Sequence, residues 1–338
     1  MNSPLVSVVM CEHNTPIEFF VEAIKSVLNQ TYENFEIILV DDCTTTDIYS
    51  LHILEDKRVK IIKNKTNLKL SRSRNIAIDA AKGKYIAIMD TDDICEPTRL
   101  EEQVRYLEEN PNVVACGTWI HAFGKREHIF KRVINDTEYY RCCLLFNNKP
   151  ALINPSVMIR KETLTKNSIR VRENLYSAED YQMWVELSRV GDIRNVEKVL
   201  FNYRLREGQM SQIYRTEDLS PNGWYIFSEQ LKRIGFQITE EDEKFLRLNY
   251  LKKEVSPIKY FRFLKRIIEL NRVSKEYVPE KLELRVKHQW MSKIYATKNP
   301  FSLIKLFFQL PFKEKFRLIG YEFQRLNRKK MHLLENEV

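Results

Sequence analysis

The chain has 338 residues, of which only 8 are glycine, and no two glycines lie closer together than seven positions. Glycine-rich phosphate-binding loops need several glycines within about eight residues, so that backbone N–H groups can approach the phosphate. The composition therefore excludes P-loops and dinucleotide fingerprints. With 43% apolar and 30% charged residues, the chain has the make-up of a globular protein rather than a disordered one.

Charge is distributed unevenly along the chain. The net charge is +9, yet residues 244–338 hold 23 basic and 9 acidic side chains, whereas residues 1–243 hold 32 basic and 37 acidic ones. The six cysteines form no C-x-x-C pair, the N-terminus has no signal-peptide pattern, and no apolar run is long enough to span a membrane. We therefore expect a cytoplasmic protein with reduced thiols.

The first 120 residues alternate between predicted strands and helices. Short apolar runs rich in β-branched residues predict strands at 5–10, 35–40, 59–62, 85–89 and 113–118. Apolar residues at helical spacing predict helices over 16–28, over 71–81 with a C-terminal glycine at Gly83, and after Pro97. This alternation is typical of an α/β fold with a mainly parallel central sheet and helices on both faces.

The pattern changes twice further along the chain. Residues 120–215 are predicted to form short strands, loops and one helix over 179–189. Beyond residue 215 the pattern is helical, basic and rich in Tyr and Phe. We expect one domain over 1–215 and a basic, helical C-terminal region over 216–338.

Acidic residues follow two of the predicted strands. Asp41 and Asp42 come after the second strand, and Asp90-Thr91-Asp92-Asp93 follows the fourth. The carboxyl ends of parallel strands lie along one edge of a sheet, where ligands bind. A single aspartate there is usually a helix cap or a turn residue, but the two groups together favour a ligand or cation site.

The second acidic group suits a hard divalent cation. Mg²⁺ or Mn²⁺ is typically held by one or two carboxylates plus phosphate oxygens of a substrate. An ion at Asp90 and Asp92 would supply the positive charge that a glycine-rich loop cannot supply here. Asp42 is placed to accept a hydrogen bond from a base or a ribose.

Charged residues at the starts of two predicted helices are further candidates. Arg72 and Arg74 either reach a bound nucleotide or form a solvated surface pair. Glu179 and Asp180 are either a first-turn acidic pair favoured by the helix dipole or a source of a general base. The choice depends on whether these residues face the cation site.

In this order, the motifs resemble family-2 glycosyltransferases with the GT-A fold, of the inverting, bacterial surface-polysaccharide type. The matching segments are 7–14, 40–42 with Asp47, the Ser-Arg-Asn stretch before 82–85, 90–93, 154–156, and Glu179-Asp180 with Trp184. The resemblance covers about residues 4–212. It implies a nucleotide-sugar-binding part over about 1–120 and an acceptor part over about 121–215.

The resemblance also implies roles for individual residues. Asp90, Asp92 and Asp93 would hold Mn²⁺ or Mg²⁺, and Asp180 would be the base of an inverting transfer. The residues implied to bind the nucleotide sugar are His13, Asn14, Asp42, Arg72, Arg74, Asp90, Asp92, Glu179, Arg204 and Arg206.

Two positions depart from the family pattern. Many members have a tyrosine before the first asparagine, which stacks on uracil, whereas this chain has His13. Many also carry a Tyr-Arg-x-His stretch, whereas this chain has Arg206 in place of that histidine. Arg206 is therefore a candidate for contact with the diphosphate.

The basic C-terminal region raises a separate question. Residues 301–312 are apolar, and cations crowd residues 313–330. A short apolar segment beside cations predicts peripheral contact with an anionic membrane, here the inner face of the cell membrane. Packing on the first domain or a homodimer contact is the alternative. Nucleic-acid binding is not expected, because no known signature for it is present.

The function predicted from the sequence is transfer of a hexose or N-acetylhexosamine from a UDP-sugar to a glycan hydroxyl. The acceptor would be a polysaccharide, O-antigen, capsule or lipooligosaccharide repeat, free or lipid-linked. A sugar nucleotidyltransferase is the alternative, but it usually needs a glycine-rich basic loop after the first strand, which this chain lacks. A non-catalytic sugar-binding module is a third option.

Overall fold

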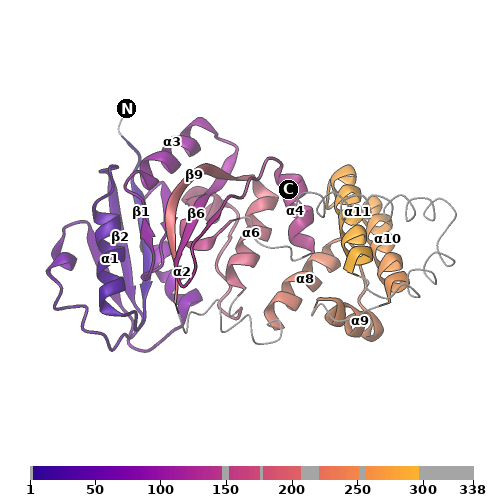
Figure 1. Cartoon of the computed structure of the whole chain (residues 1–338), viewed down its shortest axis with the longest axis horizontal. Coiled ribbons are helices and arrows are strands. Elements are labelled where there is room, and N and C mark those ends of the chain that lie inside the picture. The colour runs from indigo at the N-terminus through magenta and orange to yellow at the C-terminus, as the bar shows by residue number, and fades with distance from the viewer. Residues whose placement is uncertain (1–2, 147–151, 176–177, 207–220, 251–255, 297–338) are drawn as a thin grey trace, which may run out of the picture. The chain divides into compact units, whose positions relative to one another are not determined.

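The computed structural model describes residues 3–146, 152–175, 178–206, 221–250 and 256–296 (Figure 1). The chain divides into two compact units, Met1–Ile226 and Phe227–Val338. The candidate site lies in the first unit, which is an α/β structure. The second unit is helical wherever it is described.

The first unit is built on a nine-stranded sheet with the order β3-β2-β1-β4-β8-β6-β9-β5, and β7 pairs with β6. The strands are β1 Val6–Glu12, β2 Phe35–Asp41, β3 Val59–Lys63, β4 Tyr85–Ile88, β5 Ile94–Cys95, β6 Val113–Gly124, β7 His128–Phe130, β8 Met158–Arg160 and β9 Asp192–Leu205. The first four in spatial order are parallel to one another, β8 is antiparallel to both neighbours, and β6 is parallel to β9.

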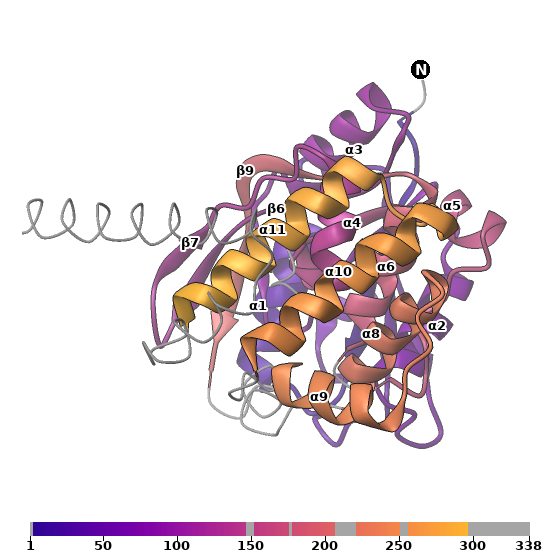
Figure 2. The ribbon, with the colours of Figure 1, turned by 90° about the vertical axis from the view of Figure 1, so that its right-hand side faces the viewer.

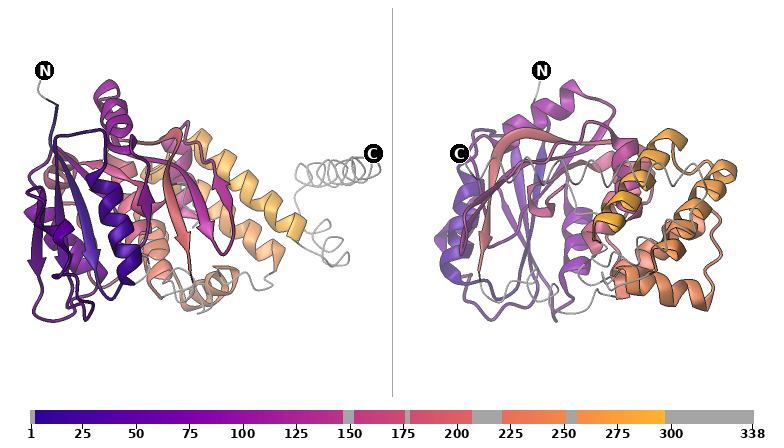
Figure 3. Two further views of the ribbon diagram at one scale, coloured as in Figure 1. Left: turned by 60° about the vertical axis from the view of Figure 1, so that its left-hand side comes forward. Right: turned by 45° about the vertical axis from the view of Figure 1, so that its right-hand side comes forward.

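Helices cover both faces of the sheet (Figure 3). Those of the first unit are α1 Ile17–Leu28, α2 Leu70–Ala80, α3 Arg99–Glu109, α4 Thr137–Leu145, α5 Lys161–Lys166 and α6 Glu179–Val190, with 3-10 turns at His52–Glu55 and Asn154–Ser156. Val8 and Met10 of β1 pack in the core on the side of α1 and α3, whereas Val9 packs on the side of α2 and α6. This alternation explains why β1 is apolar throughout, and it confirms the predicted α/β architecture.

The strand predicted to end at residue 118 continues to Gly124. It does so because β9 pairs with β6 along its whole length, with register shifts around Trp119. The two-residue strand β5 pairs with β9, so residues close after the second acidic motif join a strand about a hundred positions later. The spacing of apolar residues along the chain predicts neither the pairing of β6 with β9 nor that of β5 with β9.

Gly83 has a different role from the one predicted. Helix α2 ends at Ala80, so Gly83 does not cap it. A Cβ atom at Gly83 would lie 2.6 Å from the backbone nitrogen of Ser7 and 2.8 Å from the carbonyl oxygen of Leu5. Glycine is therefore needed for the close approach of the α2–β4 connection to β1.

Four helices make up the rest of the described chain (Figure 2). They are α8 Pro221–Arg233, which crosses the boundary between the units, α9 Glu240–Tyr250, α10 Pro257–Ser274 and α11 Pro279–Ala296. Aromatic residues pack between them, among them Phe261 against Trp290 and Phe236 against Phe263. The helical prediction is confirmed for these residues, while the apolar segment 301–312 and the cations that follow it lie outside the described residues. None of the helices in the described part of the chain is long and apolar enough to cross a membrane.

Candidate active site

The loops that follow β1, β2 and β4 lie along one edge of the sheet, because these three strands are parallel and adjacent. The loop after β1 carries His13 and Asn14, the loop after β2 begins at Asp42, and the loop after β4 is Asp90–Asp93. This edge is where ligands bind in open α/β sheets. The structure thus brings the two predicted acidic groups together on one side of the sheet.

Asp42 is only 4% exposed, and its carboxylate is held by residues that follow β3. Its Oδ1 accepts hydrogen bonds from Asn64 Nδ2 at 2.8 Å and from the backbone N–H of Leu68 at 2.7 Å. Two donors on one oxygen fix the orientation of the carboxylate. The other oxygen, Oδ2, is therefore the atom of Asp42 that suits a ligand donor such as a base N–H.

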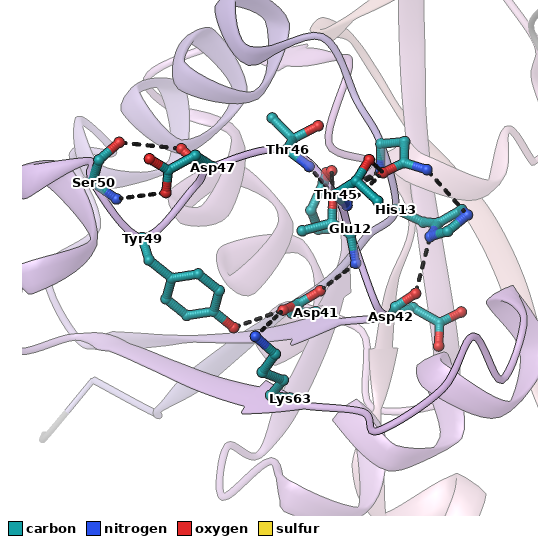
Figure 4. Close-up of polar contacts among 12 residues, drawn as sticks. Glu12, His13, Asp41, Asp42, Thr45, Thr46, Asp47, Tyr49, Ser50 and Lys63 are labelled. Carbon is teal, nitrogen blue, oxygen red and sulfur yellow. Dashed lines mark hydrogen bonds and ion pairs between the residues drawn. The ribbon is translucent and has the colours of Figure 1, made fainter.

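His13 is oriented by hydrogen bonds at both ring nitrogens, and Figure 4 draws the one to Asp42. Its Nδ1 lies 2.9 Å from the carbonyl oxygen of Asp42, and its Nε2 lies 2.8 Å from Asn67 Nδ2. The amide orientation of Asn67 is set because its Oδ1 accepts from the backbone N–H of Lys69. With Asn67 Nδ2 as the donor, Nε2 of His13 accepts a hydrogen bond, and Nδ1 faces the carbonyl oxygen of Asp42.

Side chains rather than glycines shape the loops around Asp42. Asn14 has a left-handed backbone, with φ of 56°, and its Oδ1 accepts from the backbone N–H of Thr45 at 2.7 Å. Asp41 is fully buried and accepts from the backbone N–H of Thr44 and from the hydroxyl of Tyr49 (Figure 4). Asp41 therefore stabilises the loop, which separates its role from that of Asp42.

The Asp90–Asp93 loop is surrounded by arginines. Asp90 Oδ1 lies 3.4 Å from Arg74 Nη2, and Asp92 Oδ2 lies 2.9 Å from Arg206 Nε. Asp93 is fully buried, its Oδ1 accepts from the backbone N–H of Arg204, and its Oδ2 has no hydrogen-bond partner. Burial and the neighbouring aspartates raise the pKa of Asp93 well above its ordinary value.

Arg204 is engaged by the protein. Its guanidinium lies between the rings of Phe19 and Phe123, 4.2 and 4.7 Å from their centroids, and it pairs with Glu22. Its Nε donates to the carbonyl oxygen of Asp92 at 2.7 Å. In this structure Arg204 holds the acidic loop in place, and its predicted contact with the donor stays a prediction.

The donor set fits a divalent cation only in combination with a substrate. Within the described ranges, no three His, Cys, Asp or Glu side chains are grouped so as to hold a metal ion. Asp90 and Asp92 offer hard carboxylate oxygens, while Asp93 is turned into the protein. Mg²⁺ or Mn²⁺ bound by one or two carboxylates plus phosphate oxygens matches this set.

Arg74 connects the acidic loop to helix α6. Its guanidinium, on a side chain only 4% exposed, lies 3.4 Å from Asp90 Oδ1 through Nη2 and 3.6 Å from Glu179 Oε1 through Nη1. Glu179 and Asp180 form the first turn of α6, so Arg74 places that turn beside the acidic loop. Glu179 is therefore joined through Arg74 to the predicted cation site, and the role of Asp180 stays a prediction.

The electrostatics of this cluster follow from burial. Burial, Asp92 and Glu179 raise the pKa of Asp90 to about 6, and the positive charge of Arg74 opposes that rise. Burial likewise raises the pKa of Asp180, again opposed by Arg74. A carboxylate with a raised pKa binds a proton more readily than an ordinary one, which is the property a general base needs.

Arg72 lies apart from this cluster. Its side chain is 56% exposed, and its nearest acidic atom is Glu173 Oε2 at 3.9 Å. Of the two arginines predicted at the start of α2, Arg74 is therefore joined to Asp90 and Glu179, and Arg72 is a solvated residue in this structure.

Several residues of the site carried no role in the sequence interpretation. Asn64 and Asn67 orient Asp42 and His13, and Glu12 and Thr44 connect neighbouring loops. Their only sequence signal is that polar residues stand at or shortly after the ends of β1, β2 and β3. That signal locates the edge of the sheet but not the partner of each side chain.

The chain is similar in sequence to known glycosyltransferases. The family model described as Glycosyl transferase family 2 matches residues 7–167. A glycosyltransferase of Haemophilus influenzae is 35% identical over 231 residues, which cover 64% of this chain and 70% of that protein. Glycosyltransferase MJ1057 of Methanocaldococcus jannaschii is 34% identical over 221 residues, covering 63% and 76% of the two chains.

The fold also has solved counterparts. The crystal structure of S. aureus TarS 1–349 in complex with UDP-GlcNAc has a TM-score of 0.57 and 18% identity, and the match covers 85% of this chain and 90% of that one. The chain belongs to glycosyltransferase family 2 and is a transferase. The GT-A fold expected from the motifs is confirmed.

The position of Arg74 predicts a measurable effect on Asp90. Replacing Arg74 with methionine removes the positive charge that lowers the pKa of Asp90, so this pKa should rise above its value of about 6. Carbon-detected NMR titration of the aspartate carboxyl groups would measure the shift. Arg72→Met on the same helix is the matched control and should leave the Asp90 titration unchanged. An unchanged Asp90 pKa in Arg74→Met would contradict the pairing.

Proposed function

We propose that the protein transfers a hexose or N-acetylhexosamine from a UDP-sugar to a hydroxyl group of a glycan acceptor, with inversion at the anomeric carbon. The observation that carries the proposal is the meeting of Asp90 and Glu179 at the guanidinium of Arg74. This contact supports a diphosphate site next to the helix turn that carries the proposed base. TarS, which shares the fold, has been solved with UDP-GlcNAc, and this supports a UDP-sugar as the donor.

The proposed reaction is a single displacement. The Asp180 carboxylate accepts the proton of the acceptor hydroxyl while that oxygen attacks the anomeric carbon on the face opposite the diphosphate. The bond from the anomeric carbon to the diphosphate oxygen breaks, and its electron pair leaves with UDP. The raised pKa of Asp180 supports its assignment as the base.

Charges around the leaving group support the same reaction. Mg²⁺ or Mn²⁺ would be held by Asp90 and Asp92 and would supply positive charge next to the diphosphate. Arg206 contacts Asp92 and is the residue directly after β9. From there its guanidinium can also meet a phosphate oxygen. At the other end of the donor, Asp42 Oδ2 and the His13 ring are proposed to meet the uracil base.

The acceptor and the place of action complete the proposal. A lipid-linked glycan at the inner face of the cell membrane would suit a chain whose residues 244–338 are strongly basic. Helix α10 presents the exposed cations Arg262, Lys265 and Arg272, as contact with anionic lipids requires.

The products distinguish the proposed reaction from nucleotidyl transfer. With a panel of nucleotide sugars and Mn²⁺, we expect the protein to release UDP, slowly to water and faster with a glycan acceptor. Coupled assays for nucleoside diphosphate and for pyrophosphate, run on the same samples, measure the two outcomes. Pyrophosphate release would favour a nucleotidyltransferase, and release of neither product would favour a sugar-binding module.

Asp180 is expected to be essential for turnover but not for donor binding. Asp180→Asn keeps the shape of the side chain and removes the proton acceptor, so turnover should fall by about 10²- to 10⁴-fold. Radiolabelled sugar transfer and donor titration by calorimetry measure the two properties separately. Glu186→Gln, further along the same helix, is the control. Near-normal turnover in Asp180→Asn would assign the base to another residue.

Asp92 is expected to act on metal-dependent donor binding. Asp92→Ala removes a carboxylate oxygen from the proposed cation site, so the affinity for UDP in Mn²⁺ should fall by at least about tenfold, while the affinity without metal should change little. Calorimetry with and without Mn²⁺ gives both values. Asp79→Ala, an exposed aspartate on α2, serves as control. Equal UDP affinity in Asp92→Ala and wild type would contradict the assignment.

A further inference from the structure

Glu12 is a buried carboxylate that connects the loops of the candidate site. It is the last residue of β1 and is fully buried. Its Oε1 accepts a hydrogen bond from the backbone N–H of Thr15 at 2.8 Å and one from Thr44 Oγ1 at 3.3 Å. One carboxylate oxygen therefore joins the loop after β1 to the loop after β2.

A third loop is attached through Thr15. The hydroxyl of Thr15 lies 2.8 Å from the hydroxyl of Thr91, which stands between Asp90 and Asp92. Thr91 in turn donates to the carbonyl oxygen of Cys11, next to Glu12 in β1. Three strand-end loops that are far apart in the sequence thus meet around one buried carboxylate.

The buried carboxylate of Glu12 lowers the stability of the folded protein relative to a fully hydrogen-bonded contact. Its second oxygen, Oε2, is buried and has no hydrogen-bond partner, and burial raises the pKa of the group. An unsatisfied buried polar atom costs stability, and a charged one costs more than a neutral one. The arrangement is therefore better explained by what the three loops carry than by stability.

We propose that Glu12 is a positioning residue, which holds the loops around the nucleoside and the Asp90–Asp93 loop at the separation that one UDP group spans. This inference rests on the proposed UDP-sugar donor. The loops after β1 and β2 carry His13 and Asp42, and the Thr91 loop carries the proposed diphosphate site. If the nucleoside loops and the Asp90–Asp93 loop are already fixed relative to each other, UDP can bind both, and no free energy is lost in ordering the loops when it binds.

The test compares uridine, which reaches only the nucleoside loops, with UDP, which also reaches the Asp90–Asp93 loop. In Glu12→Ala, the affinity for uridine should fall less than the affinity for UDP, because uridine needs only the link between the loops after β1 and β2, whereas UDP also needs the link through Thr15 to Thr91. The affinity for UDP in Mn²⁺ should fall by about 10- to 100-fold, because UDP needs both halves in register. Calorimetry with uridine, UMP and UDP measures the series, and the loss should grow with ligand length.

Two further variants separate positioning from general destabilisation. Glu12→Gln keeps an oxygen for the Thr15 N–H and should restore UDP affinity. Thr91→Val removes only the hydroxyl link and should show the same ligand pattern as Glu12→Ala, which keeps the test open if the alanine variant does not fold.

Glu36 provides the matched control. It is a half-buried glutamate of β2 that joins Ser7 and the backbone N–H of Lys82 at the opposite edge of the sheet. Glu36→Ala should lower the melting temperature and leave the ratio of UDP to uridine affinity unchanged. Equal loss of uridine and UDP affinity in Glu12→Ala, or the same change of ratio in Glu36→Ala, would overturn the inference. Failure of the wild type to bind UDP would overturn the proposed donor with it.

Discussion

The site depends on one buried guanidinium. Arg74 is almost completely removed from solvent, and such a charge is stable only when carboxylates surround it. Its partners are supplied by the loop after β4 and by the first turn of α6. The same ion pairs that satisfy Arg74 therefore determine how far the proposed base lies from the proposed diphosphate site. The packing of α2 and α6 on the sheet keeps Arg74, the loop after β4 and the first turn of α6 together.

Because glycine is scarce, other residues form the turns of the loops at the nucleoside end. Left-handed backbone, which glycine adopts most easily, is here adopted by Asn14, Cys43 and Lys69, all in loops at the nucleoside end. Side-chain oxygens of Asn14 and Asp41 hold these loops by accepting backbone N–H groups. Rigidity that other nucleotide sites obtain from a glycine-rich turn is obtained from a network of threonine, asparagine and aspartate.

The sequence predicted the parts of the site that depend on local pattern. The strands ending near Met10, Val40 and Met89 followed from apolar runs, and the parallel order placed Asp42 and Asp90 on one edge. It could not predict that Arg74 pairs with Glu179, more than a hundred positions away, because that contact depends on how α6 packs. The pairing of β5 with β9 and the role of Glu12 were missed for the same reason.

The pairing of β5 with β9 has a consequence for the newly made chain. The Asp90–Asp93 loop reaches its final contacts only when Arg204 has been synthesised, since the backbone of Arg204 binds Asp93 and β9 holds β5. At about 5–20 residues per second, this wait lasts roughly 6–23 seconds. For the first part of that interval, until residues 158–160 have been made, β4 also lacks its neighbour β8 and presents an unpaired edge. The order of the strands along the chain thus makes the growing polypeptide vulnerable to aggregation until its catalytic unit is complete.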